Sequence, residues 1–505
     1  MRRVVAVWFP AWPTDRLRRS SGAPAPEMPL ITAGSDGRRM QVAAADRAAL
    51  ALGIRPGMAL AHARAMVPGL VVEDADPEGD SAALARMAAW CLRYSPLTAG
   101  DHPDGVWIDI TGCAHLQGGE AALLADMLER IAGGGTQARA AAADTPGAAH
   151  AVARFGPDQA AVVASGGHQA AIAPLPTAAL RLPPETVSAL RRLGFERVGQ
   201  MAETARGPLV RRFGQQVALR LDQASGRVFE PIQPAVPDGV AAHRLAFIEP
   251  LLTAEAFGTV IDELLKAVCG ELEAAGQGAR RLDLLFERID GSVQAVRTGT
   301  SAPSRDAAHL ARLLRERLET VDPGMGVEAM QLRVPLAEAQ AFRQAAGLAG
   351  GDHPEGGGIA ALIDRLENRL GPGSVWRAAP VGSDVPERSV AAIPAAGGAP
   401  ACSWPPGLPR PVRLLDPPQP VAAIALLPDQ PPVAFTWRRK RHRIMRADGP
   451  ERIRGEWWRR NAEVAAVRDY FAVEDEEGCR FWLFRRGDGS DPASGDLRWF
   501  LHGLF

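Results

Sequence analysis

The stretch Asp104–Gly112, DGVWIDITG, decides how this chain is interpreted. It begins with an acid, continues as a short apolar strand that contains a second acid, and ends in Thr-Gly. Because side chains alternate along a strand, Asp104 and Asp109 fall on opposite faces and cannot hold one metal ion together. A two-metal site needs several carboxylates around cations that lie about 3.5 to 4 Å apart. The stretch therefore has the outline of a metal-binding strand with an incomplete set of ligands.

The bulk composition predicts a folded protein of several domains. The chain has 505 residues, which corresponds to roughly three to five domains. Its 47% apolar and 23% charged residues are ordinary for a globular protein. The formal net charge is −1, so any affinity for nucleic acid must come from local patches. Such patches would be made of arginine, because Lys266 and Lys440 are the only lysines.

The cysteines favour a reducing compartment. They form no Cys-x-x-Cys pair, which argues against a zinc site or a disulfide framework, and we expect neither a metal nor a cofactor. They stand at Cys91, Cys113, Cys269, Cys402 and Cys479. The apolar run near the first residue is too short for a signal peptide and ends at Pro10, and no later stretch is long enough to cross a bilayer. We therefore expect a cytoplasmic protein.

The order of predicted elements divides the chain into units. Strands and helices alternate over the first 175 residues, which predicts an α/β unit. After a proline-rich break, short helices hinged on glycines predict a compact α domain that ends near Glu230. A β-α-β-β-α-β order then follows, which is typical of a ferredoxin-like split motif with two helices on one face of the sheet.

The last two segments differ in composition from the rest. Residues 346–411 are rich in Gly, Ala and Pro apart from the helical island at 359–371, and they predict a flexible linker. Residues 412–505 contain short apolar runs and five tryptophans, and they predict a small β-rich domain.

The segment Tyr94–Glu120, YSPLTAGDHPDGVWIDITGCAHLQGGE, resembles the palm motif of Y-family translesion DNA polymerases. In that motif a Ser-Ile-Asp-Glu core leads into an apolar strand that ends in Asp-x-Thr. Asp104 stands at the aspartate of the core, whereas Gly105 stands at the glutamate. The family also carries Asp-x-Asp-x-Phe-Phe after its first strand, where this chain has WFPAWPTDRL with Trp8 or a neighbour at the metal-binding aspartate. The resemblance implies that the acids near Trp8 and Gly105 are lost and that Asp104 is vestigial.

Two further segments depart from active polymerases of this family. In ADRAALALGIRPGM, residues 45–58, Arg47 and Leu50 fall near the positions of the Tyr-x-x-Arg motif that grips the nucleotide. In AAADTPGAAHAVARFG, residues 141–156, the lysines of an active palm are absent. The resemblance therefore implies that the triphosphate clamp is lost as well.

The resemblance implies an α/β and α+β multidomain protein with a Y-family polymerase-like fold. It would have a palm, fingers, a thumb with a helix-hairpin-helix and a ferredoxin-like little finger, followed by a small β-rich C-terminal domain that binds partners. The boundaries we expect are 1–30 and 80–175 for the palm, 31–79 for the fingers, 176–232 for the thumb, 240–345 for the little finger, 346–411 for the linker and 412–505 for the last domain.

These departures match one branch of the family, which consists of polymerase-like mutagenesis factors without a functional metal site. The resemblance extends to the last residues, RWFLHGLF at 498–505. It implies a non-catalytic DNA-binding adaptor in damage-induced mutagenesis and translesion synthesis, associated with the nucleoid. The partners it implies are primer-template DNA, the sliding clamp, an ImuA-type RecA-like accessory protein and an error-prone replicative-type DNA polymerase, with no membrane.

Two groups of residues are candidates for DNA binding. The turn LGFERVG has the shape of a helix-hairpin-helix, in which backbone N–H groups at glycines can face a phosphate; alternatively its glycines serve only as helix caps. Its candidates are Gly194, Phe195, Val198 and Gly199. Arginines of the predicted little finger could follow a duplex backbone, or they could be ordinary solvated side chains. They are Arg280, Arg281, Arg288, Arg297 and Arg333, of which we favour the last three.

Candidates for partner binding lie later in the chain. In RQAAGLAGG, Gln344 and Leu348 are in the place of a clamp-binding peptide, or the segment is a helix end that runs into a linker. The arginine clusters and tryptophans after residue 437 could bind single-stranded nucleic acid. They could equally form a β-domain whose tryptophans lie in the core and whose arginines are solvated or meet an acidic partner. The partner-binding candidates are Trp457, Trp458, Trp499, Phe500 and Phe505.

Two rival functions remain open from the sequence. One is a slow polymerase that uses Asp104 with Asp15 or Asp109 in an altered geometry, which requires these carboxylates to converge within reach of one metal ion. The other is a scaffold for proteins that never contacts DNA, which the near-neutral net charge would allow.

Overall fold

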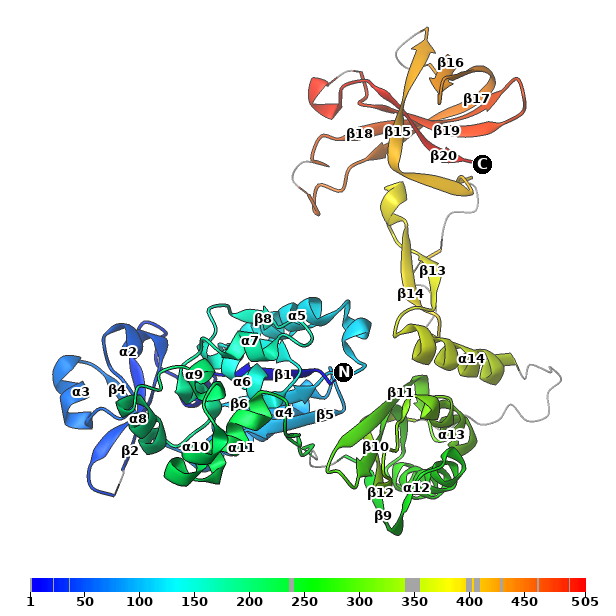
Figure 1. Ribbon diagram of the computed structural model, residues 1–505. Coiled ribbons are helices and arrows are strands. Elements are labelled where there is room, and N and C mark those ends of the chain that lie inside the picture. Colours follow the sequence, from blue (N-terminus) through cyan, green and yellow to red (C-terminus); the bar gives the residue numbers. More distant parts are fainter. Residues whose placement is uncertain are drawn as a thin grey trace. The chain divides into compact units, whose positions relative to one another are not determined.

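The computed structural model divides the chain into two compact units, residues 1–372 and 373–505 (Figure 1). Each unit is described by itself. The residues that the structure describes are 2–20, 22–35, 37–235, 240–340, 355–396, 402–403, 409–426, 430–460, 463–489 and 491–505.

A five-stranded sheet lies at the centre of the first half of unit 1. Its order is β5-β6-β1-β7-β8, and all neighbours are antiparallel except β7 and β8. The strands are β1 (Val4–Trp8), β5 (Leu97–Asp101), β6 (Gly105–Asp109), β7 (Arg139–Ala143) and β8 (Ala160–Val162). The strands are near-continuous apolar runs, such as VVAVW in β1, so both faces of this sheet are buried.

Helices cover each face of the central sheet. On one face Val5, Val7 and Ile108 pack with residues of α4 (Pro77–Cys91) and α5 (Glu120–Gly133). On the other face the small residues of α6 (Pro146–Phe155) approach the sheet closely, and Thr145 caps this helix by accepting a hydrogen bond from the Ala148 N–H. The helix α1 (Trp12–Arg18) follows β1, and the short α7 (His168–Ile172) follows β8.

A small sheet and a set of short helices flank this core. The small sheet has the order β3-β2-β4 and its own apolar core. Its elements are β2 (Leu30–Ser35), β3 (Met40–Ala45), α2 (Arg47–Ala51), α3 (Leu60–Met66) and β4 (Val71–Asp74). The helices that follow are α8 (Pro184–Arg192), α9 (Val198–Ala202), α10 (Arg206–Phe213) and α11 (Gln215–Ala224).

A four-stranded antiparallel sheet with two helices forms the next part of unit 1. Its order is β11-β10-β12-β9, and α12 and α13 bury their apolar faces against it. The elements are β9 (Ala242–Leu251), α12 (Ala254–Ala274), β10 (Gln277–Arg288), β11 (Val293–Ser304), α13 (Ala307–Arg315) and β12 (Val327–Ala339). The predicted β-α-β-β-α-β order is therefore confirmed.

The segment predicted as a flexible linker contains regular structure in its described part. The helix α14 (Glu355–Leu370) packs on the edge strand β11. Asn368 exchanges hydrogen bonds with both backbone groups of Gly299, and Asp364 accepts from the Ser301 N–H. Further along, β13 (Trp376–Pro380) and β14 (Val390–Pro394) form a hairpin at the start of unit 2. The predicted helical island at 359–371 corresponds to α14, whereas composition did not predict the β13–β14 hairpin.

The rest of unit 2 is a closed six-stranded barrel, which confirms the β-rich C-terminal fold. Its strands are β15 (Arg413–Ala425), β16 (Pro432–Trp437), β17 (Lys440–Arg454), β18 (Val467–Asp475), β19 (Arg480–Arg486) and β20 (Trp499–Leu504). Aromatic and aliphatic side chains such as Phe435, Phe471 and Leu483 fill its interior. Closure leaves the barrel without free sheet edges. Among the described residues of the whole chain, no helix is both long and apolar enough to cross a membrane.

Candidate functional site

Three residues form a row across the central sheet at the place of the expected metal site. Strand pairing puts Gly105 directly opposite Trp8 on one side and opposite Asp101 on the other. A Cβ atom added at Gly105 would lie 3.0 Å from the backbone oxygen of Val7 and 3.1 Å from Oδ2 of Asp101. A side chain at this position would therefore require its neighbours to shift by a few tenths of an ångström.

The carboxylate of Asp104 is engaged on both of its oxygens. Oδ1 accepts a hydrogen bond from Nη2 of Arg154 at 2.7 Å, and Oδ2 accepts one from the indole Nε1 of Trp8 at 3.0 Å. Arg154 comes from the last turn of α6, and its guanidinium lies 5.5 Å from the centre of the Trp8 ring. A side-chain cation thus occupies the neighbourhood of the one carboxylate that remains at the expected site.

Asp101 belongs to the same polar cluster. Its Oδ2 is 2.8 Å from Nδ1 of His150 and 3.5 Å from Nη2 of Arg154. Burial alone would raise the pKa of Asp101, but the hydrogen bond from His150 and the positive charge of Arg154 outweigh burial and lower it. Burial lowers the pKa of His150, so this imidazole is neutral at neutral pH and donates to an ionised Asp101.

The other acids considered for a metal site lie elsewhere. Asp109 is at the far end of β6, where it pairs with Arg2 at 2.8 Å and accepts from Thr111. Asp15 accepts a hydrogen bond from the backbone N–H of Gln137 at 3.0 Å. In the described parts of the chain, neither joins Asp104 in a group of carboxylates with metal-ligand spacing.

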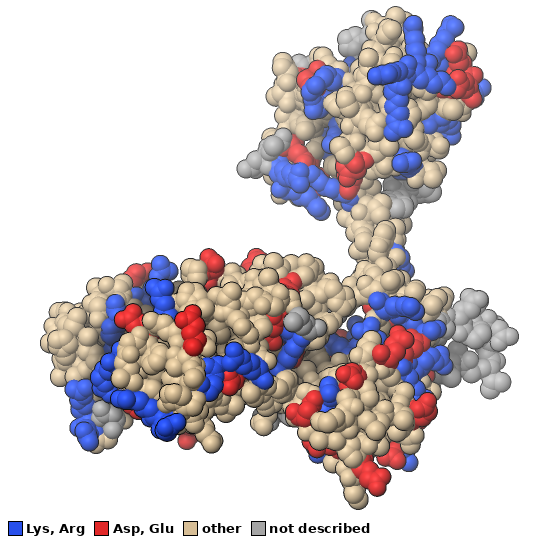
Figure 2. Space-filling model, viewed as in Figure 1, with Lys and Arg blue, Asp and Glu red and all other residues tan. Residues whose placement is uncertain are grey.

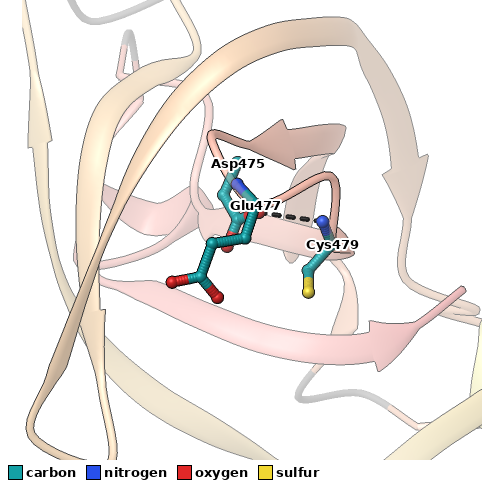
Figure 3. Close-up of side chains that lie close together, drawn as sticks. All are labelled: Asp475, Glu477 and Cys479. Atoms are coloured by element: carbon teal, nitrogen blue, oxygen red, sulfur yellow. Dashed lines mark hydrogen bonds between the residues drawn. The ribbon is translucent and has the colours of Figure 1, made fainter.

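The described residues contain one group of three potential ligand atoms within 4.8 Å of one another, at Asp475, Glu477 and Cys479 in unit 2 (Figure 3). Oδ1 of Asp475 accepts hydrogen bonds from the backbone N–H groups of Glu477 and Cys479, and Oδ2 is hydrogen-bonded to Nδ1 of His442. Glu477 pairs with Lys440 at 2.5 Å. These bonds account for the cluster as the turn between β18 and β19.

A cavity of about 400 Å³ lies beside Asp104, between the central sheet and the small sheet. Its wall contains Leu50, Thr32 and several alanines and prolines, with the acids Asp80 and Asp104. No described residue in this wall is a lysine or an arginine, and Arg47 is exposed outside it. Both acids are already paired with arginines, Asp80 with Arg16 and Asp104 with Arg154, so the wall offers a triphosphate neither a lysine nor an arginine.

The backbone of the turn at residues 193–199 does not offer free N–H groups. Those of Gly194 and Phe195 donate to α8, and those of Val198 and Gly199 donate to the carbonyl oxygens of Leu175 and Ala173. Phe195 packs partly against the core, and Val198 is buried. The backbone contact to phosphate that we predicted from the glycines is therefore not available, because this turn docks on the preceding segment.

Exposed arginines lie in the last turns of α8 and α10, in the same segment as this turn. The segment 176–232 contains nine arginines and five acids. Arg191 and Arg192 end α8, and Arg211 and Arg212 end α10; all four are exposed and have no ion pair with a described carboxylate. Figure 2 shows Lys and Arg side chains over this part of unit 1, where Figure 1 labels α8 and α10. Each helix places its arginines immediately before an apolar residue and a glycine.

The three arginines favoured from the predicted little finger serve the protein itself. Arg297 pairs with Asp283 at 2.6 Å and donates to the Leu92 carbonyl. Arg333 is buried, and it donates to Gln331 and to the Ala235 carbonyl at 3.0 Å. Arg288 pairs with Asp290 at 2.9 Å, and only 17% of its side chain is exposed. Scattered arginines in a sequence do not reveal such partners.

The partner-binding candidates have mixed positions. Gln344 and Leu348 lie outside the described residues. Trp457 and Trp458 are 61% and 65% exposed and contact each other edge to face. Trp499, in contrast, lies in the barrel core, as expected if the tryptophans of this domain form its core. Phe500 stacks on Phe484, and Phe505 lies under the guanidinium of Arg480.

Sequence reasoning missed Asp101, His150 and Arg154. The one available signal was the spacing of His150 and Arg154, four residues apart, which puts both on one face of a helix such as α6. The strand pairing that brings this face to Asp101 and Asp104 was not visible in the sequence.

Three comparisons place the chain among known proteins. The model of the impB/mucB/samB family matches residues 25–154. The protein ImuB of two strains of Caulobacter vibrioides, NA1000 / CB15N and ATCC 19089 / CIP 103742 / CB 15, is 47% identical over 465 residues, which cover 90% of this chain and all of the relative.

Solved structures were also found. DinB from Sulfolobus solfataricus is 16% identical, with a TM-score of 0.39, over 66% of this chain and 98% of its own. A post-insertion binary complex of Dbh DNA polymerase is 15% identical, with a TM-score of 0.40 and the same coverage. The fold, the altered row at Trp8 and Gly105 and the family match define a Y-family polymerase-like protein. With nearly half of its residues identical over the whole length of a relative, the chain belongs to the ImuB family.

Proposed function

We propose that this chain is a non-catalytic, polymerase-shaped DNA-binding adaptor in damage-induced mutagenesis and translesion synthesis. The observation that carries the proposal is the occupation of Asp104 by Arg154 and Trp8. A lone carboxylate is a poor site for Mg²⁺. A divalent cation at Asp104 would in addition have to displace a guanidinium that already neutralises it, against the repulsion of like charges.

The cavity beside Asp104 supports the same conclusion. Catalysis of nucleotidyl transfer needs cations that hold the triphosphate and neutralise the charge that develops in the transition state. The described wall of this cavity has no lysine or arginine, and Gly105 contributes no carboxylate to hold a metal ion. The site thus lacks a second carboxylate for the metal ion and cations that would hold the triphosphate.

DNA binding is attributed to arginine side chains of the α8–α11 segment. Arg191, Arg192, Arg211 and Arg212 are exposed at helix ends, and long guanidinium side chains at such positions reach phosphates without help from backbone amides. The segment has nine arginines against five acids, although the whole chain carries a net charge of −1. This contrast favours a local contact with nucleic acid over a scaffold that never touches it.

The partners we propose are those that the family resemblance implies: the sliding clamp, an ImuA-type RecA-like protein and an error-prone replicative-type polymerase. Gln344 and Leu348 remain our proposal for the clamp contact. Trp457 and Trp458 are our proposal for a protein contact, because a pair of exposed tryptophans is characteristic of interface hot spots.

Primer extension by the purified protein alone tests the proposal. We expect no extension on undamaged or abasic templates with Mg²⁺ or Mn²⁺, from protein that still shifts primed DNA in a gel. Asp104→Ala is the matched control for a working metal site. Extension that disappears in this variant would contradict the adaptor and support a slow polymerase, whereas failure to retain primed DNA at low salt would support a pure protein scaffold.

A further inference from the structure

The hairpin between β16 and β17 has an unusual turn. Trp437 pairs directly with Lys440, so Arg438 and Arg439 alone form the loop. Both have positive φ angles, 49° and 67°. A two-residue loop with two left-handed residues is a type I′ turn, for which Asn-Gly is the preferred sequence. Two adjacent arginines in this conformation are strained, and strain of this kind is found where a side chain has a function.

The turn presents its charges to solvent. Arg438, Arg439, Arg441 and Arg443 are all exposed, and none pairs with a carboxylate in the described chain. Arg438 lies 4.6 Å from the centre of the Trp437 ring, which holds its guanidinium beside the turn. Figure 2 shows Lys and Arg side chains concentrated over the end of the barrel where Figure 1 labels β17.

The acids next to the hairpin are partly committed to other contacts. Asp475 is buried and bonded to His442, and Glu477 is paired with Lys440. The acidic turn after β18 is thus attached to the first residues of β17, next to the loop, and leaves the four arginines without carboxylate partners in the described chain. Unit 2 as a whole has 19 basic and 16 acidic side chains, an excess of three positive charges.

We propose that the β16–β17 hairpin binds the phosphodiester backbone of nucleic acid. Arg441 and Arg443 stand two residues apart on β17, which separates them by about 6.8 Å along the strand, a spacing comparable to that of consecutive phosphates on an extended strand. Guanidinium groups bind phosphate oxygens with two parallel hydrogen bonds.

Nucleic acid fits these observations better than an acidic protein surface does. Four carboxyl groups at residues 474–477 are close in the sequence and in the fold, yet Arg438, Arg439, Arg441 and Arg443 do not pair with them. Two of these carboxylates, Asp475 and Glu477, are already paired with His442 and Lys440, so the row of guanidiniums remains for a ligand with regularly repeated charges. This site is on unit 2 and does not depend on the arginines of α8 and α10, so the inference stands apart from the proposed function.

The double variant Arg438→Asn with Arg439→Gly tests the inference in the full-length protein. It places Asn-Gly in a type I′ turn, so two charges are removed while the turn gains its preferred residues. We expect the unfolding temperature to stay the same or rise. We expect binding of a fluorescein-labelled 30-nucleotide single strand to weaken several-fold. The slope of log K against log salt should fall by about 1.4, or about 0.7 for each lost phosphate contact.

Arg413→Gln with Arg498→Gln is the matched control, because it removes the same charge from exposed positions of unit 2 outside the hairpin. Unchanged affinity and salt slope in the hairpin variant would overturn the inference, as would an equal loss in the control. Loss of retention on immobilised polyglutamate with unchanged binding of the oligonucleotide would assign the hairpin to an acidic protein instead. The inference about the hairpin is independent of Arg211 and Arg212: loss of DNA binding in a variant of these two arginines would not change the effect expected for the hairpin variant.

Discussion

At the scale of single residues, hydrogen bonds and ion pairs within the chain hold the polar cluster around Asp104. Trp8 donates a hydrogen bond to Asp104, and the absence of a side chain at Gly105 leaves room for the carboxylate of Asp101. Arg154 then supplies the positive charge that the remaining acids require. Because His150 is neutral, Arg154 offsets one of the two carboxylate charges, and these polar contacts stabilise the protein.

Arg154→Ala should destabilise the protein by about 1 to 3 kcal/mol, the cost of leaving buried charged groups without partners. Because the pKa of Asp101 is lower in the folded than in the unfolded chain, its ionised form stabilises the fold above the unfolded value of about 3.9. That contribution is lost as the pH falls through the folded pKa. The difference between wild type and variant in urea unfolding should thus be largest at neutral pH and shrink in acid.

Arg154→Lys is the control for this experiment, since it keeps the charge but not the planar fork. It should lose less stability than the alanine variant. Equal unfolding free energies for wild type and Arg154→Ala at every pH would show that Arg154 does not stabilise the carboxylates.

At the scale of elements, α14 protects the free edge of the four-stranded sheet. An unpaired edge strand is a template for association with other chains. Asn368 and Asp364 bind the backbone of β11 at Gly299 and Ser301, where a neighbouring strand would otherwise pair. Oδ2 of Asp364 also lies 2.8 Å from Nε2 of His309 on α13, so α13 provides a second contact that holds α14 in place.

Asn368→Ala should open this edge. The backbone groups of Gly299 would lose their partners, at a cost of about 1 to 3 kcal/mol, and α14 would detach more often. Hydrogen exchange at the amides of Gly299 and Ser301 should accelerate, whereas Arg369→Ala, on the exposed side of the same helix, should leave both rates unchanged. Unchanged exchange in Asn368→Ala would mean that the helix does not hold the edge.

The sequence predicted elements better than it predicted their partners. The period of apolar residues located the strand around Val106 and the helix around Leu264, because each pattern is local. The pairing of Asp104 with Arg154 joins residues 50 positions apart, and it depends on β6 and α6 meeting on one sheet. The same holds for the candidates Arg297 and Arg333, whose charges looked free in the sequence but are bound by distant groups.

At the scale of the whole molecule, the charge is divided between regions in a way that the total conceals. The net charge is −1, but the segment 176–232 has four more basic than acidic side chains, and unit 2 has three more. The excess acid lies in the rest of unit 1. Nucleic acid would therefore be held at two basic surfaces, one in each unit, with the acidic remainder disfavouring non-specific adsorption along the chain.

Removing one of these surfaces should leave the other measurable. Arg211→Ala with Arg212→Ala deletes two exposed guanidiniums at the end of α10 and should reduce the salt slope for a primed duplex by about 1.8, or about 0.9 for each phosphate contact. Arg86→Ala with Arg312→Ala removes the same charge from exposed positions on α4 and α13 and serves as the control. Fluorescence anisotropy across several salt concentrations gives the slopes. If the α10 variant and its control both have the same salt slope as wild type, the duplex is held elsewhere. If the slope changes only in the α10 variant, the arginines of α10 contact the duplex. The affinity that remains in that variant should then be the part that the hairpin variant removes.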